Sequence, residues 1–222
     1  MAKEIDWFGR TEFGKEIEKQ DIPSTENDWE ENEINLAEAN KTCGIPVRFW
    51  NARLADYPSE ITDKFKKFAL QKNNDNIFGI CGNVGTGKTY TVCAGMHERV
   101  IAGMNAGLFL SCRILKPMIM TSRSFKADIS EMDLYEKYSK TPFLVLDEIG
   151  KCSDAQIEWD FITTIIALRY DNGLPTAFTT NMDFGNFKTF ICGDNNKGLD
   201  VYDRMHSVFI GEVMTGNSHR GE

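Results

Sequence analysis

The sequence has few of the residues that build metal sites. Its 222 residues include only three histidines, at scattered positions, and no C-x-x-C pair. A structural zinc site is built from clustered cysteine or histidine ligands, so we expect none here. The cysteines are Cys43, Cys81, Cys93, Cys112, Cys152 and Cys192. Several of them lie within apolar runs, so we expect reduced, mostly buried thiols, as is usual for cytosolic proteins.

Long apolar runs and excess positive charge are also missing. No run is long enough to span a membrane, and the first residues lack the apolar core of a signal peptide. We therefore expect a cytoplasmic protein that makes no membrane contact. A net charge of −8 argues against a strongly basic nucleic-acid binder, although it is compatible with a local basic patch.

A glycine-rich loop follows a short apolar run, Ile77–Cys81, that is typical of a buried parallel strand. The loop matches G-x-x-x-x-G-K-[ST], in which glycines let backbone N–H groups approach a phosphate. Lys88 is expected to reach the β- and γ-phosphates of ATP, and the Thr89 hydroxyl to ligate Mg²⁺. The predicted nucleotide-binding residues in this loop are Gly82, Asn83, Val84, Gly85, Thr86, Gly87, Lys88, Thr89 and Tyr90.

A second apolar run, Phe143–Leu146, ends in two carboxylates. Ligands of open parallel sheets lie at the carboxyl ends of the strands, so Asp147 is expected to meet the Mg²⁺ and the nucleotide. Glu148 is expected to polarise the attacking water. A third predicted strand, residues 175–180, is followed by Asn181, which either senses the γ-phosphate or only caps a loop.

Three further segments have less specific patterns. Residues 1–40 are acidic and contain scattered aromatics, so they are either a solvated leader or a partner-binding arm, ahead of a domain over residues 41–222. Residues 48–57 either cover the base of a nucleotide or pack in the core. Residues 186–199 are polar and are expected to form an inserted loop.

The segment 113–126 combines methionines with cations and is predicted to be helical. It is either a core helix with a solvated basic face or a helix that follows a phosphate backbone, with an aromatic ring stacking on a base. The candidate DNA-binding residues are Lys116, Arg123, Phe125 and Lys126.

These motifs, in this order, resemble the AAA+ ATPases. The closer resemblance is to bacterial and phage replicative helicase loaders of the DnaC/DnaI type and to IstB-like ATPases of insertion sequences, and it covers about residues 34–222. It is carried by Gly44-Ile45-Pro46, Val145–Gly150, Arg169-Tyr170, Pro175-Thr176, Thr180-Asn181, Asp203–Met205, and Gly216, Ser218 and Arg220 near the end.

The resemblance implies an α/β fold of the P-loop NTPase type, an αβα sandwich with a central parallel sheet and no C-terminal helical lid domain. It also implies site residues: Asn181 as a sensor, Arg204 as an arginine finger acting on a neighbour's ATP in a homo-oligomer, and Arg220 as a second sensor. In these loaders, an insertion equivalent to residues 113–138 contacts single-stranded DNA.

The expected function is therefore Mg²⁺-dependent ATP hydrolysis by a DNA replication protein, a helicase loader whose partners are a replicative helicase and single-stranded DNA. Two alternatives are open. One is an IstB-like transposition helper that binds duplex DNA. The other is a nucleotide-dependent binding module with negligible turnover.

Overall fold

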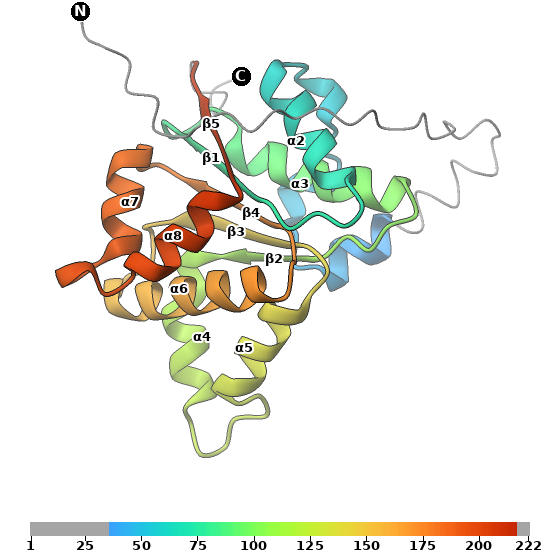
Figure 1. The fold of residues 1–222 in the computed structure, drawn as a ribbon. Coiled ribbons are helices and arrows are strands. Elements are labelled where there is room, and N and C mark those ends of the chain that lie inside the picture. The colour runs from blue at the N-terminus through green and yellow to red at the C-terminus, as the bar shows by residue number, and fades with distance from the viewer. Residues whose placement is uncertain (1–35, 217–222) are drawn as a thin grey trace, which may run out of the picture.

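The fold is built on a five-stranded parallel sheet, whose carboxyl edge positions the residues of the cavity described below. The computed structural model describes residues 36–216. The strands lie in the order β2-β3-β4-β1-β5 (Figure 1). They are β1 (Ile77–Gly82), β2 (Leu108–Ser111), β3 (Leu144–Ile149), β4 (Thr176–Thr180) and β5 (Phe209–Met214). All the strand pairs run parallel, so their carboxyl ends meet at one edge of the sheet.

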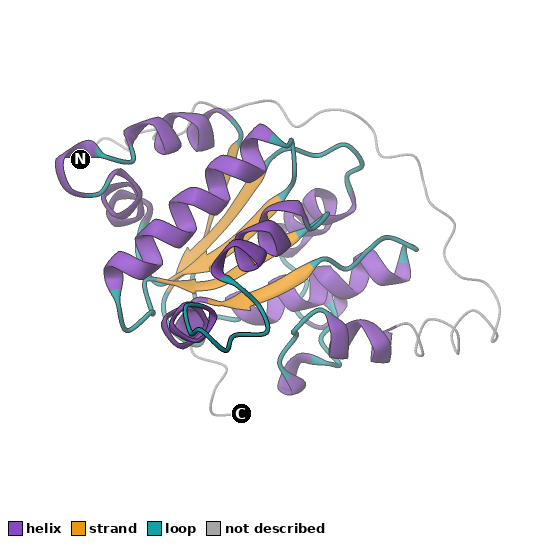
Figure 2. Cartoon of the chain, turned by 90° about the horizontal axis from the view of Figure 1, so that it is seen from below, coloured by secondary structure: helices purple, strands orange, loops and turns teal. Residues whose placement is uncertain are grey.

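Helices cover both faces of the sheet (Figures 1 and 2). One face carries α2 (Glu60–Leu70) and α3 (Lys88–Ile101), and the other carries α6 (Ala155–Asp171), α7 (Phe184–Cys192) and α8 (Leu199–Ser207). The helices α4 (Leu115–Ser122) and α5 (Glu131–Lys140) project beyond the sheet (Figure 1). Residues 36–42 are helical, and short 3-10 turns form η1 (Val47–Phe49), η2 (Leu54–Asp56), η3 (Cys112–Ile114) and η4 (Asp194–Asn196).

Two hydrophobic cores, one on each face, explain why the predicted strands are continuously apolar. Along β3 the side chains alternate: Val145 packs in the core under α2 and α3, whereas Leu144 and Leu146 pack in the core under α6. All three are fully buried. The predicted αβα sandwich with a central parallel sheet is therefore confirmed.

Residues 186–199 are not the predicted loop. Their first half belongs to α7, whose N-cap is Asp183: its side chain accepts the Asn186 N–H. Phe187 and Ile191 lie four residues apart, on one face of the helix, and both are buried in the core against α6 and α8. The sequence prediction was wrong here because the polar, glycine-containing run 193–198 was grouped with the apolar positions that precede it.

The preceding segment packs on the domain. Asn40, which the sequence analysis placed in the leader, is buried, and its side-chain oxygen lies 2.8 Å from Nε2 of the fully buried His97. The rest of the leader, residues 1–35, lies outside the described residues. No helix in the range 36–216 is long and apolar enough to cross a membrane.

Candidate functional site

The loop Gly82–Thr89 joins β1 to the first turn of α3 at the carboxyl edge of the sheet. Gly82 has φ +150°, and a Cβ there would lie 2.1 Å from the Met214 carbonyl oxygen, so only glycine fits. The Lys88 ammonium folds back over the loop and donates to the Gly82 and Asn83 carbonyls, each at 2.7 Å. The loop thus wraps around a positive charge at a helix N-terminus, an arrangement suited to phosphate.

A cavity of about 600 Å³ opens over this loop. Its floor is formed by residues 84–91, and Glu148 and Asn181 lie on its wall. The cavity is large enough for a nucleotide-sized ligand. It therefore brings the predicted loop, the predicted base and the predicted sensor around one space.

The segment 48–62 closes another side of the cavity, so it lies next to any bound ligand. The Tyr90 hydroxyl donates to the Asp56 carboxylate and accepts the Arg53 N–H at 3.1 Å. The Tyr57 and Tyr90 rings pack edge to face, with centroids 5.1 Å apart. Both alternatives for residues 48–57 hold in part: the two ends of the segment line the cavity, whereas Ala52 and Leu54 are buried in a small hydrophobic cluster with Ala94.

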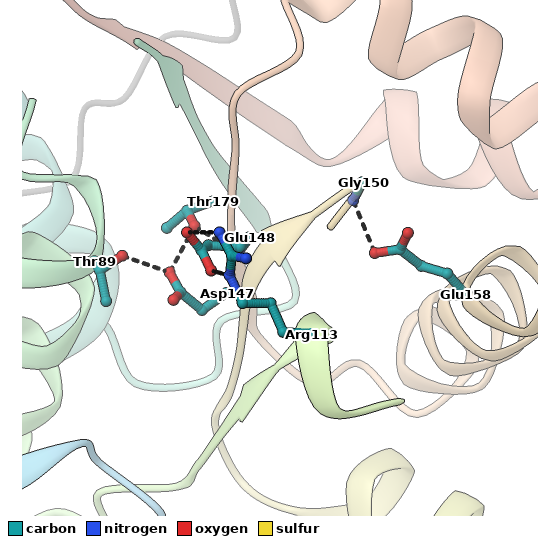
Figure 3. A network of polar contacts seen from close by, with 7 residues as sticks. All are labelled: Thr89, Arg113, Asp147, Glu148, Gly150, Glu158 and Thr179. Atoms are coloured by element: carbon teal, nitrogen blue, oxygen red, sulfur yellow. Dashed lines mark hydrogen bonds and ion pairs between the residues drawn. The ribbon is translucent and has the colours of Figure 1, made fainter. Parts of the chain in front are cut away.

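Asp147 lies at the end of β3 and is nearly fully buried. Its Oδ1 accepts hydrogen bonds from the hydroxyls of Thr89, at 2.9 Å, and Thr179, at 2.7 Å (Figure 3). Burial raises the pKa of this carboxyl to about 6, although the two hydroxyl donors and nearby Lys88 act in the opposite direction. A cation at this position would restore the charged form.

Thr89 and Asp147 have the right chemistry for Mg²⁺. Both supply oxygen donors, which Mg²⁺ prefers, and the two oxygens already lie within hydrogen-bond distance of each other. They lie beside the Lys88 loop, so a cation held by them would be next to phosphates bound by that loop. The residues present therefore fit the expected ion.

Glu148 follows Asp147 in an unusual backbone conformation. Its φ is +60°, and its N–H donates to the Thr179 hydroxyl at 2.9 Å. The β3–β4 register shifts between Leu146 and Ile149, so this residue lies in a bulge at the rim of the sheet. The bulge turns the carboxylate towards the cavity.

The Glu148 carboxylate is held there by Arg113. The Arg113 guanidinium donates from Nε to one carboxylate oxygen and from a terminal nitrogen to the other, at 3.1 Å (Figure 3). This pairing raises the pKa of the Arg113 guanidinium above its already high usual value. In this conformation the carboxylate that is predicted to polarise water is engaged by a cation.

Arg204 lies apart from this site. It is on α8, does not line the cavity, and donates to both carboxylate oxygens of Asp171 on α6, at 3.0 and 3.1 Å. Both side chains are partly exposed. Arg220 lies outside the described residues.

The candidate DNA-binding residues lie on α4 and the turn that follows it. The Lys116 ammonium is 3.6 Å from the Asp154 carboxylate, and Arg123 forms two hydrogen bonds with Glu131. The side chain of Phe125 is fully exposed, and Lys126 is also exposed. None of the four lines the cavity.

Sequence reasoning missed three residues of this network: Arg113 as the partner of Glu148, Thr179 as a donor to Asp147, and Glu158. The buried Glu158 accepts the Gly150 N–H at 2.8 Å (Figure 3). The position of Thr179 at the end of a strand next to β3 was the available signal. Arg113 and Glu158 carried no local signal, because a cation near a basic helix and a glutamate in a first helical turn are both ordinary.

Comparison with known proteins agrees with this geometry. The replicative helicase loader DnaC of Escherichia coli K12 is 28% identical over 128 residues, which are 58% of this chain and 49% of that protein. The DnaC of Buchnera aphidicola from Acyrthosiphon pisum is 26% identical over 169 residues, 73% of this chain and 66% of that protein. The chain thus spans about half the length of the first of these relatives.

Solved structures share the fold. A DnaI crystal structure superposes with a TM-score of 0.62 at 20% identity, covering 79% of this chain and 94% of that one. A DnaC helicase loader structure gives 0.59 at 22% identity, covering 77% and 100%. The family described as IstB-like ATP binding protein matches residues 47–221. Because that match spans most of the sequence, the chain belongs to the IstB-like family of ATP-binding proteins.

Proposed function

We propose that this chain hydrolyses Mg²⁺-ATP and uses the nucleotide cycle to load a replicative helicase onto single-stranded DNA. The proposed hydrolysis is supported by one observation: the Thr89 hydroxyl donates to Asp147, and Glu148 lines the same cavity as Thr89. The loader assignment draws on the similarity to proteins named replicative helicase loaders.

In the proposed reaction, the loop N–H groups and Lys88 hold the phosphates, and Thr89 and Asp147 hold the cation. A Mg²⁺ held by these two residues would supply positive charge against the charge that develops on the phosphate oxygens. Glu148 orients the attacking water, and the Asn181 amide, on the same cavity wall, contacts the γ-phosphate or that water. Phosphoryl transfer needs this positioning more than covalent chemistry.

Arg113 restrains Glu148 in this role. The guanidinium engages both carboxylate oxygens and so makes the carboxylate a weaker acceptor for a water proton in this conformation. Arg113 belongs to η3, which leads directly into α4. A displacement of α4 on DNA binding would therefore reach the Glu148 carboxylate through this ion pair.

Turnover is proposed to require assembly. Arg204 lies on α8 and does not line its own cavity, so its proposed target is the γ-phosphate bound by a neighbouring copy. An exposed ion pair such as Arg204–Asp171 contributes only about 0–1 kcal/mol, so the guanidinium can exchange Asp171 for phosphate. Arg220 is proposed as a second phosphate contact.

Single-stranded DNA is proposed to bind along α4 and the following turn. Lys116, Arg123 and Lys126 supply charge, and Phe125 supplies an exposed ring for stacking. The leader ahead of the packed helix 36–42 is proposed as the arm that binds the helicase, because residues 1–35 contain aromatics and carry many carboxylates.

The test combines ATP turnover with helicase binding. Turnover is measured alone, with single-stranded DNA and with duplex DNA, and the replicative helicase is co-purified with the intact chain and with a variant lacking residues 1–30. That deletion leaves Leu36 and Asn40 in place on the core. We expect stimulation by the single strand, and helicase binding by the intact chain only.

One second function has an observation in its favour. The match to the IstB-like family over residues 47–221 is compatible with a transposition helper that binds duplex DNA. Stimulation by duplex DNA together with no helicase binding would favour that function. ATP binding without turnover under all conditions would favour a nucleotide-dependent binding module.

A further inference from the structure

A buried carboxylate holds the turn that follows Glu148. Glu158 lies in the first turns of α6 with 2% of its surface exposed. Its Oε1 accepts the Gly150 N–H at 2.8 Å, and the N–H groups of Lys151 and Cys152 also face the carboxylate. Within residues 36–216, no lysine or arginine lies within ion-pair distance of it.

Capping α6 does not explain this buried group. The N-cap of α6 is Asp154, whose side chain accepts the Ile157 N–H at 3.1 Å. Burial raises the pKa of the Glu158 carboxyl, while the three facing amides favour its charged form. Burying this carboxylate costs free energy, and α6 does not need it as a cap. Its contacts are instead with the turn at residues 150–152.

The backbone turn at residues 148–151 determines where the Glu148 side chain points. Glu148 and Gly150 both have positive φ, +60° and +90°, and the Lys151 N–H closes the turn on the Glu148 carbonyl at 3.1 Å. On the β4 side, the Thr180 hydroxyl donates to the Ile149 carbonyl at 2.9 Å, beside the Thr179 contact described above. A non-glycine residue with positive φ persists only where its surroundings fix it.

We propose that Glu158 is a positioning residue, which fixes the turn after Glu148 from the α6 side and so aims the Glu148 carboxylate into the cavity. This inference rests on the proposed role of Glu148 in orienting water. The role requires a carboxylate, because its two oxygens accept from several N–H groups, whereas glutamine offers one acceptor oxygen and turns an NH₂ towards the same donors. Small displacements of a catalytic group greatly reduce turnover.

The test is Glu158→Gln, with Asp160→Asn as the matched control. Asp160 lies on the same helix and is exposed, and its substitution by asparagine removes the same negative charge. We expect Glu158→Gln to lower kcat about 10- to 100-fold, because a misplacement of a catalytic group by about 1 Å can cost about 10²-fold. The KM for ATP and ATP affinity should stay unchanged, because Glu158 does not line the cavity. Asp160→Asn should behave as wild type.

Two further readouts separate positioning from a purely structural role. Hydrogen exchange at the amides of residues 150–152 should accelerate in Glu158→Gln and stay unchanged in Asp160→Asn. Glu158→Asp, which keeps the charge on a shorter side chain, should recover part of kcat. A melting temperature measured with each variant, and turnover normalised to nucleotide-binding protein, correct for unfolded material.

The outcomes distinguish this inference from the proposed function. Wild-type kcat in Glu158→Gln, alongside loss of turnover in Glu148→Gln, overturns the inference alone. A parallel loss of ATP affinity and turnover in Glu158→Gln also overturns it, because the residue is then structural. Absence of turnover in the wild-type protein overturns the proposed hydrolysis and this inference with it.

Discussion

The Arg113 guanidinium donates hydrogen bonds to both carboxylate oxygens of Glu148, the residue proposed to orient the attacking water. The pair joins two elements that are far apart in the sequence: the η3 turn before α4, and the bulge at the end of β3. The side chain of Glu148 is mostly shielded and that of Arg113 is mostly exposed. The charge that restrains Glu148 is therefore accessible from outside the site.

Removing the guanidinium should raise basal turnover. An ion pair with one exposed partner contributes about 0.5–1 kcal/mol, so Arg113→Ala should increase ATP turnover without DNA about two- to fivefold. Lys140→Ala, which removes the exposed pair with Glu136 on α5, is the control and should have no effect. A fall in turnover in Arg113→Ala would mean that Arg113 assists the reaction.

Turnover should depend on Arg204 from a neighbouring copy. Arg204→Ala and Lys88→Ala proteins should each be nearly inactive, since an arginine finger contributes about 10³-fold or more. Mixed, they should recover part of the activity, because some interfaces then pair an intact loop with an intact finger. Asp171→Ala, which removes the same ion pair, should retain turnover. No recovery in mixtures that co-assemble would exclude a finger acting between copies.

Neutralising the exposed cations after α4 should weaken DNA binding and reduce its salt dependence. The slope of log affinity against log salt falls by about 0.7 for each lost single-strand phosphate contact, so Arg123→Gln with Lys126→Gln should lower it by about 1.4. Lys67→Glu, on exposed α2 surface, is the control. An unchanged slope would leave this segment as a solvated basic face.

Phe125→Ala tests stacking separately from charge. The ring is fully exposed and carries no charge, so its loss should lower single-strand affinity while leaving the salt slope unchanged. Stacking on an aromatic is worth about 1–3 kcal/mol per base, equivalent to about 5- to 150-fold in affinity. Fluorescence anisotropy of a labelled oligonucleotide at several salt concentrations measures both quantities. An equal affinity would exclude this ring from the DNA contact.

The parts of the site that sequence could predict are those with a local signature. The loop ending in Lys88 and Thr89, and the strand ending in Asp147, follow from residue types at fixed spacing, and parallel topology brings their ends together. The Arg113–Glu148 pair and the Glu158 contacts depend on a bulge and on side-chain directions between distant segments. Periodicity and spacing carry no information about those.

In the fold, too, the elements with a local sequence signature were predicted and those that depend on tertiary packing were not. The strands were recognisable because burial on both faces makes them continuously apolar, as at Phe143–Leu146. The helix α7 was missed because its buried apolar side chains, Phe187, Ile191 and Cys192, were grouped with the polar run that follows them. Tertiary packing, rather than local propensity, stabilises that helix.

The central claim is that Lys88 holds ATP and that Glu148 orients the water that hydrolyses it. The most direct measurement is ATP binding and turnover in Lys88→Ala and Glu148→Gln side by side. Lys88→Ala should lose ATP binding, whereas Glu148→Gln should bind ATP as wild type does and lose turnover by about 10²- to 10⁴-fold, the contribution of a general base. Hydrolysis at the wild-type rate by Glu148→Gln would contradict the account.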